Sequence, residues 1–293
     1  MGYQAVSEID NRRDVLSMTP SPKIQTEQDV PRLFNFDLPV LKKTGNALPE
    51  LADSSNTHRI LDIASGSGEW AIMAAQASPH MQIVGIEGNA QLVDHARALA
   101  QAQGVSNVSF TVMDPFQALD FADGSFDLVN ARFIVGLLLA EDWPKVLGEF
   151  VRVTRSDGII RLTENDLPIT SSPAYANVGG LISDALHSTK RSFSPHGRLL
   201  SVTPELKRLL QAAGCQNVRR EVYLTNYSAG MEAHEEICQY AATTYRLVQP
   251  MLVNTKVKKQ PDIEQLYQQM LTEMQSEDFL AVAYYLTVWG TKP

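Results

Sequence analysis

The amino-acid sequence predicts an α/β protein with a doubly wound, Rossmann-like sheet of seven strands, mostly parallel with the last strand antiparallel, and with helical lid insertions. Two observations predict this class. From Arg59 onward, short apolar segments typical of buried strands alternate with segments whose apolar residues recur at helical spacing. The chain has 293 residues, 44% of them hydrophobic, so it can bury one large core in a single domain with insertions.

The first half of the sheet follows from four apolar segments with helices between them. Boundary signals support these helices: Asn89 can cap one, Gly104 lies just past its end, and Pro144 fits the first turn of another. The predicted strands are Arg59 to Ala64, Met81 to Ile86, Val108 to Val112 and Phe126 to Asn130, and the predicted helices are Glu69 to Ser78, Ala90 to Gln103 and Asp142 to Val153.

The second half of the pattern is interrupted twice. Ser156-Asp157-Gly158 predicts a turn into strand five, and Gly214 ends the helix that begins at Thr203. The predicted strands are Ile159 to Thr163, Val218 to Leu224 and Ala283 to Trp289, and the interruptions are residues 165–201 and 227–282. The second interruption contains two helices with apolar and aromatic faces, formed by Ile237, Tyr240, Ala241, Tyr245 and Val248 and by Ile263, Leu266, Tyr267, Met270 and Met274.

Both insertions leave from the carboxyl ends of strands, the edge where open α/β sheets bind ligands. We therefore expect residues 59–293 to form one domain whose insertions 165–201 and 227–282 make a helical cap. Residues 1–58, with a short helix from Leu33 to Lys43, are expected to form an arm that completes the lid. Sideways packing of the same helices as a homodimer interface stays open as an alternative.

Composition excludes several classes of function. The formal charge of −8, from 25 Lys and Arg against 33 Asp and Glu, argues against a nucleic-acid partner, because phosphate binding needs clustered cations. Cys215 and Cys238 form no metal-spaced cluster and are expected to be reduced thiols. Residues 1–13 lack the apolar stretch of a secretion signal, and the longest apolar run, residues 133–140, is far shorter than the roughly 20 residues of a membrane span. A cytoplasmic protein without a membrane span is expected.

The strongest local signal is the segment 60–70, a strand that runs into a turn of small residues and then a helix. Gly66 and Gly68 would let the backbone approach a ligand at a helix N-terminus, although tight turns of this kind also use glycine for purely structural reasons. Gly66-x-Gly68-x-x-Ala71, with Glu87 about 20 positions further on, also fits the dinucleotide fingerprint. An NAD-dependent oxidoreductase is therefore a rival interpretation.

Acids at the ends of successive strands argue for a different ligand. Asp62, at the mouth of the glycine turn, would repel a pyrophosphate but would attract the ammonium of an amino-acid moiety. Glu87 can accept bonds from ribose hydroxyls in either interpretation. Asp114, between Met113 and Pro115-Phe116, can accept from an adenine amino group beside apolar side chains, or it can simply form a turn before proline.

Residues 59–165 resemble the class I S-adenosylmethionine-dependent methyltransferases, especially the ubiquinone and menaquinone biosynthesis type and related small-molecule enzymes. The resemblance covers little more than a third of the chain. It departs from the family pattern at Ala64, where the first glycine is commonest, and at Ser156-Asp157-Gly158, which replaces the usual Pro-Gly-Gly. It is carried by Leu61-Asp62-Ile63-Ala64-Ser65-Gly66-Ser67-Gly68, Glu87, Asp114, the segment from Asp123 to Val129 and the segment from Phe150 to Gly158.

The resemblance implies that S-adenosyl-L-methionine is the cofactor and that a small, largely apolar or aromatic molecule accepts the methyl group. Its methionine part would be held by Asp62, Ala64, Ser65, Gly66 and Gly68, its ribose by Glu87 and Gly88, and its adenine by Met113, Asp114, Pro115 and Phe116. Asn130, Ala131 and Arg132 would line the methyl-transfer face. The resemblance leaves open whether carbon, oxygen or nitrogen is methylated.

Methyl transfer asks mainly for alignment and desolvation, because the sulfonium is already activated. A base is needed only where the acceptor carries its proton into the transition state. The strand end Asn130-Ala131-Arg132-Phe133 lacks the prolines of amino-directed DNA methyltransferases and the acid of the metal-dependent catechol type, so no metal is expected. A catalytically silent cofactor-binding module stays a third alternative. The candidate catalytic residues are Arg132, as an anion anchor or a partner of Glu164, and Glu164, Tyr175, His187 and His196.

Overall fold

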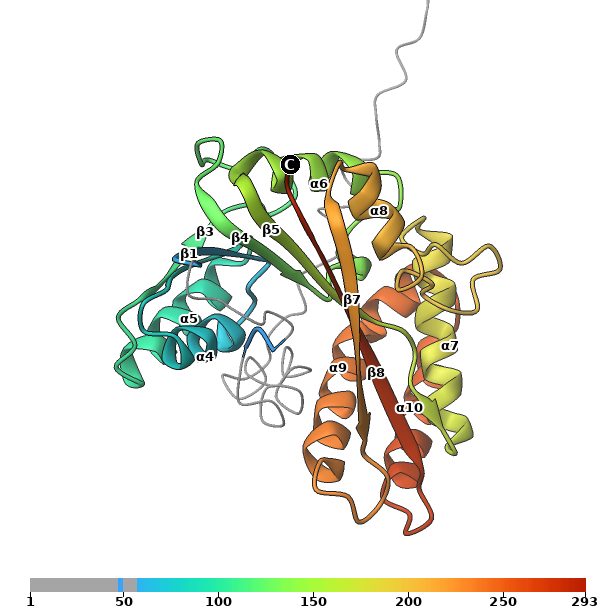
Figure 1. Ribbon diagram of the computed structural model, residues 1–293. Helices are drawn as coiled ribbons and strands as arrows, with labels where there is room; N and C mark the ends of the chain where they lie inside the picture. The colour runs from blue at the N-terminus through green and yellow to red at the C-terminus, as the bar shows by residue number, and fades with distance from the viewer. Residues whose placement is uncertain (1–46, 50–56) are drawn as a thin grey trace, which may run out of the picture.

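The computed structural model describes residues 47–49 and 57–293. The N-terminal helix expected at Leu33 to Lys43 lies outside these residues. In the described part, one eight-stranded sheet is flanked by helices (Figure 1), in the order β3-β2-β1-β4-β5-β8-β6, and β7 also pairs with β8. The strands are β1 Arg59–Ile63, β2 Gln82–Glu87, β3 Val108–Val112, β4 Phe126–Arg132, β5 Thr154–Asn165, β6 Ile169–Thr170, β7 Gln216–Asn226 and β8 Ala281–Thr291.

The strand directions are those expected of a doubly wound sheet. The neighbouring pairs among β3, β2, β1, β4 and β5 are parallel, and β8 is antiparallel to β5, β6 and β7. The expected mostly parallel sheet with an antiparallel last strand is confirmed. The expected strand number was wrong by one, because β6 has only two residues within the first insertion and so carries no alternating pattern.

The helices begin and end close to the expected signals. Asn89 caps α5 by accepting a bond from the Gln91 amide at 2.9 Å, and Gly104 beyond its end has a φ of 66°. The helices are α4 Glu69–Ala77, α5 Ala90–Ala102, α6 Trp143–Val153, α7 Pro173–Ser188, α8 Leu206–Ala212, α9 His234–Asn254 and α10 Gln260–Met274, with a short 3-10 helix, η2, at Val135–Leu137.

One boundary differs clearly from expectation. The turn expected at residues 156–158 lies inside β5, which starts directly after α6 at Thr154. Pairing with β4 resumes only after a register shift, because Phe126 faces Thr154 whereas Leu128 faces Ile159. Asp157 has a φ of 58°, so the backbone turns at this position within the strand. The expected turn therefore does not separate two elements.

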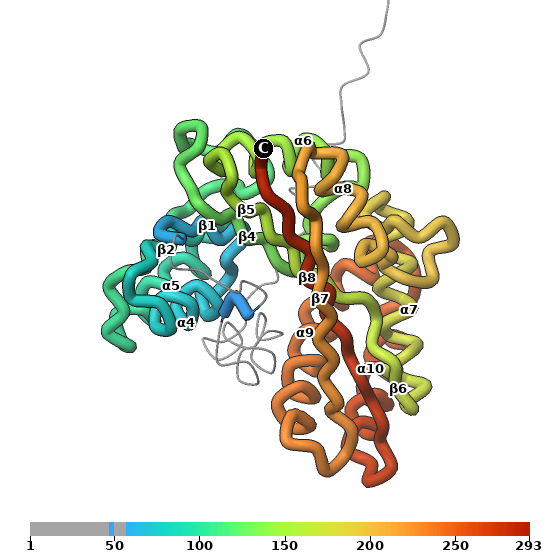
Figure 2. Tube along the Cα trace, in the orientation of Figure 1, coloured from blue at the N-terminus to red at the C-terminus, as the bar shows by residue number. Residues whose placement is uncertain are grey.

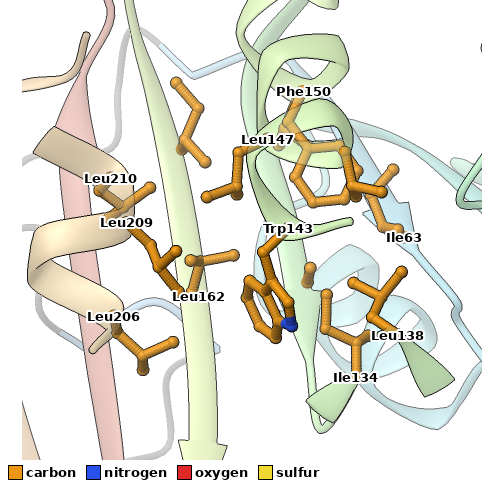
Figure 3. Close-up of a cluster of buried hydrophobic side chains, with 14 of the residues drawn as sticks. Ile63, Ile134, Leu138, Trp143, Leu147, Phe150, Leu162, Leu206, Leu209 and Leu210 are labelled. Atoms are coloured by element: carbon orange, nitrogen blue, oxygen red, sulfur yellow. The ribbon is translucent and has the colours of Figure 1, made fainter. Parts of the chain in front are cut away.

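Strand alternation divides the core into two layers. Leu61, Ile63, Leu162 and their neighbours pack against α6 and α8 on what we term the α6 face, where Trp143 and Phe150 are fully buried (Figure 3). The opposite side, termed the α4 face, buries Ile60 and Leu128 against α4 and α5. Burial of each large side chain contributes about 1.5–3 kcal/mol relative to leaving it exposed, so both layers stabilise the sheet that carries the site.

The two insertions supply a helical layer beyond the carboxyl end of β5. Asn165, the last residue of β5, pairs with Tyr285, and the preceding residues of β8 continue past it beside β7 (Figure 2). Helices α7, α9 and α10 pack against one another and share an aromatic cluster with this part of the sheet. Glu273 ties α10 to the start of α7 by accepting bonds from Ser172 Oγ at 2.6 Å and the Ala174 amide at 2.9 Å. In the part of the chain that the structure describes, no helix is long and apolar enough to cross a bilayer.

Candidate cofactor and active site

The turn between β1 and α4 has a left-handed backbone at three positions. Ala64, Gly66 and Gly68 have φ values of 52°, 57° and 81°. Gly68 is also needed for packing, since a Cβ atom there would lie 2.6 Å from Phe110 Cζ and 2.7 Å from Ala96 Cβ. The structural explanation of Gly68 is therefore supported, and its role in ligand binding stays a prediction. Ala64 adopts the left-handed conformation despite its Cβ, which explains why glycine is the usual residue of the family there.

Buried polar atoms without partners surround this turn. Among the described residues, Asp62 Oδ2, Ser65 Oγ and Ser67 Oγ are buried and make no hydrogen bond. Unsatisfied buried groups are costly, so a ligand that supplies donors and acceptors would be bound favourably here. Burial raises the pKa of Asp62 to about 7, although a bond from Asn130 and the charge of Arg161 oppose this shift. The set fits the ammonium and carboxylate of a methionine moiety.

Glu87 connects the ends of β1 and β2. Its carboxylate accepts bonds from the Gly66 amide at 3.2 Å and the Asn89 amide at 3.0 Å. Burial raises its pKa, while these backbone donors lower it in part. The carboxylate is thus fixed beside the glycine turn, and its remaining lone pairs can accept ribose hydroxyls.

The end of β3 lies next to Glu87. The Met113 amide donates to the Glu87 carbonyl at 3.0 Å, and a Cβ added at Gly88 would lie 3.9 Å from Pro115 Cδ. Asp114 is exposed and accepts a bond from the Phe116 amide at 2.9 Å, which is the turn-forming arrangement expected as an alternative. That bond uses one carboxylate oxygen, so the other can still accept from an adenine amino group.

The residues expected at the end of β4 are divided between the two sheet faces. Asn130 lies on the α4 face and is fully buried, where its side chain donates to Asp62 Oδ1 at 2.7 Å. The Ala131 side chain packs in the core of the α6 face, so only its backbone can contribute to the site. Arg132 returns to the α4 face, with its guanidinium carbon 5.1 Å from the centroid of the Trp70 ring.

Arg161 and Trp70 join this site, and sequence reasoning missed both. Arg161 Nη1 donates to Asn130 Oδ1 at 2.7 Å, and its guanidinium carbon lies 5.9 Å from the centroid of the Trp70 ring. Burial and the charge of Arg161 lower the pKa of Arg132. Only the register of β4 and β5, which a single sequence does not reveal, brings Arg161 beside Asn130.

Glu164 has a different environment from the one expected of a general base. It alternates with Thr163, the register partner of Arg132, so Glu164 and Arg132 belong to opposite sheet faces. Glu164 Oε1 accepts the amides of Ile134 at 2.7 Å and Val135 at 3.1 Å. It thereby holds the turn after β4, where Phe133 has a φ of 54°. Burial raises the pKa of Glu164 to about 8.

The other catalytic candidates are not brought together. Tyr175 is buried in the aromatic cluster of the C-terminal helices, 3.2 Å from the Tyr227 hydroxyl, and burial raises its pKa well above its usual range. His187 and His196 are both exposed, at the end of α7 and in the following loop. Within residues 57–293, no group of three or more histidine, cysteine or acidic side chains has a metal-binding arrangement. The expectation of a metal-free reaction stays a prediction.

The sheet has a glycine turn and an acid at the end of each of its first three strands, an arrangement typical of enzymes that bind a nucleotide cofactor. Residues 60–158 match the family described as a methyltransferase domain. A demethylmenaquinone methyltransferase of Thermus thermophilus is 31% identical over 185 residues, which are 59% of this chain and 80% of that protein. The uncharacterized methyltransferase YcgJ of Bacillus subtilis is 32% identical over 133 residues, 45% of this chain and 47% of that protein, so this match spans about half of the relative.

Solved structures show the same fold. The crystal structure of YcgJ superposes with a TM-score of 0.51 at 18% identity, covering 87% of this chain and 97% of that one. Phosphoethanolamine N-methyltransferase 2 of Haemonchus contortus, in complex with S-adenosyl-L-methionine, gives a TM-score of 0.53 at 15% identity and covers 98% of this chain and 61% of that one.

The chain therefore belongs to the class I S-adenosylmethionine-dependent methyltransferases, and its cofactor is S-adenosylmethionine. The oxidoreductase alternative finds no support in these comparisons.

Proposed function

We propose that this methyltransferase acts on a small, largely apolar or aromatic acceptor, bound at the carboxyl edge of the sheet between the glycine turn and the C-terminal helices. The observation that carries this proposal is a pair of aromatic rings in contact at the end of β4. Phe133, the residue after β4, contacts Tyr285 edge to face with ring centroids 5.8 Å apart. Tyr285 is the partner of the last residue of β5, so both rings lie where open α/β sheets bind ligands.

The cluster behind these two rings consists of buried apolar and aromatic side chains. Tyr175 contacts Tyr245 and Phe279 with ring centroids 5.4 Å and 6.5 Å apart. Burial raises the pKa of Tyr175 and Tyr245 well above the usual range, so their hydroxyls stay protonated near neutral pH. Such a wall of aromatic side chains favours flat or apolar acceptors, whereas a small amine acceptor would gain more from anionic groups.

In this proposal the chain's own residues bind and orient the two reactants. Asp62 pairs with the ammonium of the cofactor, Glu87 accepts its ribose hydroxyls, and Asp114 with Met113 and Phe116 holds its adenine. The cofactor supplies an activated methyl group when bound. Arg132 places a cation at the same edge, where it can anchor an oxygen substituent of the acceptor and favour its anionic form. Exclusion of water and alignment of the reacting atoms then account for most of the rate.

The acceptor class can be tested with the full-length protein and methyl-labelled S-adenosylmethionine. We expect turnover with reduced demethylmenaquinone analogues, which the name of the Thermus thermophilus relative suggests, or with other alkylated phenols. Phosphoethanolamine and glycine serve as small polar acceptors. Transfer to these polar amines without transfer to any aromatic compound would refute the proposal. Asp62→Ala provides the background rate.

The aromatic wall itself has a matched control. Phe133→Leu is expected to raise the KM for the acceptor several-fold while the Kd of S-adenosylmethionine stays within about twofold. The control, Phe121→Leu, makes the same change at a partly buried ring far from the proposed acceptor site. Phe121 packs on Phe126 at the amino end of β4, with ring centroids 5.0 Å apart. The control should leave the KM unchanged. Equal effects of the two substitutions would show that Phe133 acts only through stability.

We further propose that α7, α9 and α10, from the two insertions, act as a cap over the bound acceptor. Their position beyond the carboxyl end of β5 supports this role. Hydrogen exchange in the presence of S-adenosylhomocysteine and an accepted substrate should then be slowed in residues 173–188 and 234–274. Exchange that instead depends on protein concentration and not on ligands would assign these helices to a homodimer interface.

A further inference from the structure

Three buried polar side chains form a chain of hydrogen bonds across the sheet beneath the glycine turn. Asp62, Asn130 and Arg161 are register partners on β1, β4 and β5, so all three belong to the α4 face. Asn130 Nδ2 donates to Asp62 Oδ1 at 2.7 Å, and Arg161 Nη1 donates to Asn130 Oδ1 at 2.7 Å. Their exposed fractions are 1%, 0% and 5%. Such a network in the interior of a parallel sheet replaces the apolar side chains that such strands normally bury.

The chemistry of the two end groups allows only one orientation of the Asn130 amide. An ionised carboxylate only accepts hydrogen bonds, and a guanidinium only donates them. The Asn130 carbonyl must therefore face Arg161, and its amino group must face Asp62. If Arg161 were absent, the amide could rotate and present its oxygen to the carboxylate, which would repel it.

One carboxylate oxygen of this network is left available for a ligand. Asp62 Oδ2 is buried without a hydrogen-bond partner among the described residues, whereas Oδ1 is occupied by Asn130. We infer that Arg161 is a positioning residue for the cofactor, which acts through Asn130 to hold the Asp62 carboxylate with Oδ2 directed at the ammonium of S-adenosylmethionine. This inference rests on the proposed role of Asp62 in binding that ammonium.

The charges around Asp62 support the same role. Burial raises the pKa of Asp62 to about 7, and the Asn130 bond and the charge of Arg161 restrain this rise, whereas the charge of Glu87 adds to it. The charge of Arg161 also acts on Arg132 of β4, whose pKa is lowered by burial and by that charge. On α4, burial and the charge of Glu236 raise the pKa of Glu69 to about 7. Loss of Arg161 would therefore favour protonated Asp62, which attracts an ammonium poorly.

A double-mutant cycle in the full-length protein tests the inference. Calorimetry gives the Kd of S-adenosylmethionine for wild type, Arg161→Gln, Asp62→Asn and the double variant, with circular dichroism as the check on folding. Glutamine can still donate to Asn130 Oδ1, so it removes the charge with the smallest structural change. We expect Arg161→Gln to weaken binding about tenfold at pH 7, in line with a charge-assisted bond. In the Asp62→Asn background, the same substitution should change the Kd by less than twofold.

The pH dependence of binding provides a second readout that a purely structural role would not move. Binding should strengthen as pH rises through the pKa of Asp62, and this acid limb should move to higher pH in Arg161→Gln. The alkaline limb reports the α-amino group of the ligand, with a pKa of roughly 8, and should stay in place.

The inference would be overturned if Arg161→Gln raised the Kd by the same factor in the wild-type and the Asp62→Asn backgrounds. Arg161 would then contact the cofactor itself or act through the fold. Wild-type affinity in Asp62→Asn would instead refute the proposed role of Asp62. If Arg161→Gln does not fold, Arg161→Lys replaces it in the test, because lysine keeps the charge and a donor. Its Kd for S-adenosylmethionine should lie within threefold of the wild-type value. A larger loss of affinity, with the acid limb of the binding profile unmoved, would overturn the inference.

Discussion

Gly68→Ala should destabilise the protein through two separate effects that the structure quantifies. The residue has a φ of 81°, and a left-handed backbone costs an L-residue roughly 1–2 kcal/mol. The added Cβ would lie 2.6 Å from Phe110 Cζ and 2.7 Å from Ala96 Cβ, both buried. Overpacking of this kind costs a further 1–3 kcal/mol or so, and the expected loss in the free energy of unfolding is therefore about 2–5 kcal/mol.

Gly104→Ala is the matched control for the backbone effect. Gly104 has a φ of 66°, and a Cβ there would meet nothing within 4 Å, so only about 1–2 kcal/mol should be lost. Urea denaturation gives both losses in the free energy of unfolding, provided that the dependence of this free energy on urea concentration is the same as in wild type. Equal losses at the two glycines would refute the packing argument. A Phe110→Leu background should also reduce the cost of Gly68→Ala, because it removes the contact with the phenyl ring and leaves only the contact with Ala96 Cβ.

Three further predictions follow from single contacts. Asp127→Ala removes an acceptor of the His58 and Arg59 amides and the partner of Arg155, so urea denaturation should show a loss of about 1–3 kcal/mol at neutral pH. Hydrogen bonds and the charge of Arg155 outweigh desolvation and lower the pKa of Asp127, so this contribution is complete above pH 4 and disappears as pH falls through the native pKa. Glu273→Ala, which leaves Ser172 Oγ and the Ala174 amide without their acceptor, should lower the free energy of unfolding by roughly 1–2 kcal/mol and speed hydrogen exchange at the start of α7, with a smaller loss for Glu273→Gln. In calorimetry, Asp62→Ala should weaken S-adenosylmethionine binding tenfold or more and Asp114→Ala only a few-fold, because Asp114 is exposed and stacking on the adenine survives its loss.

The parallel part of the fold could be predicted because local signals and tertiary packing agree there. Ile60, Leu61 and Ile63 mark a strand buried on both faces, and Asn89 and Gly104 mark the two ends of one helix. The sequence carries no comparable signal for β6, whose two residues are exposed or half-exposed and pair only with the start of β8. Its position depends on how the first insertion returns to the sheet, which is a tertiary property.

The cofactor side of the candidate site was easier to predict than the rest. Asp62 and Glu87 follow directly from strand ends, so their location needs only the order of the elements. Arg161 needs the register of β4 and β5, and a register shift between Phe126 and Leu128 prevents that register from being counted from the turn at residues 156–158. The opposite faces of Arg132 and Glu164 depend on the same register, which is why sequence reasoning considered them as a pair.

Glu164→Gln distinguishes a catalytic base from a residue that holds the turn after β4. Glutamine keeps an oxygen that can accept the Ile134 and Val135 amides, but it cannot take a proton from an acceptor. If Glu164 only positions the turn, the variant should retain kcat within about threefold. A base would contribute roughly 10²–10⁴-fold, so a loss of that size with an unchanged fold would contradict the positioning role.

The pH dependence of stability gives the same distinction without any acceptor. The native pKa of Glu164, about 8, lies above its ordinary value of 4.5, so the native state holds this proton more tightly than the unfolded state does. Its contribution to stability is therefore complete below pH 4.5 and is lost as pH rises towards 8. Asp62 and Glu69, both with a pKa raised to about 7, act in the same direction, so the informative quantity is the difference between wild type and Glu164→Gln at each pH. Between pH 5 and pH 8, the free energy of unfolding of Glu164→Gln, measured by urea denaturation, should rise by a few kcal/mol relative to that of wild type. A constant difference over this range would show that the carboxylate stays ionised in the fold, and the two backbone amides would then be stronger partners than burial is costly.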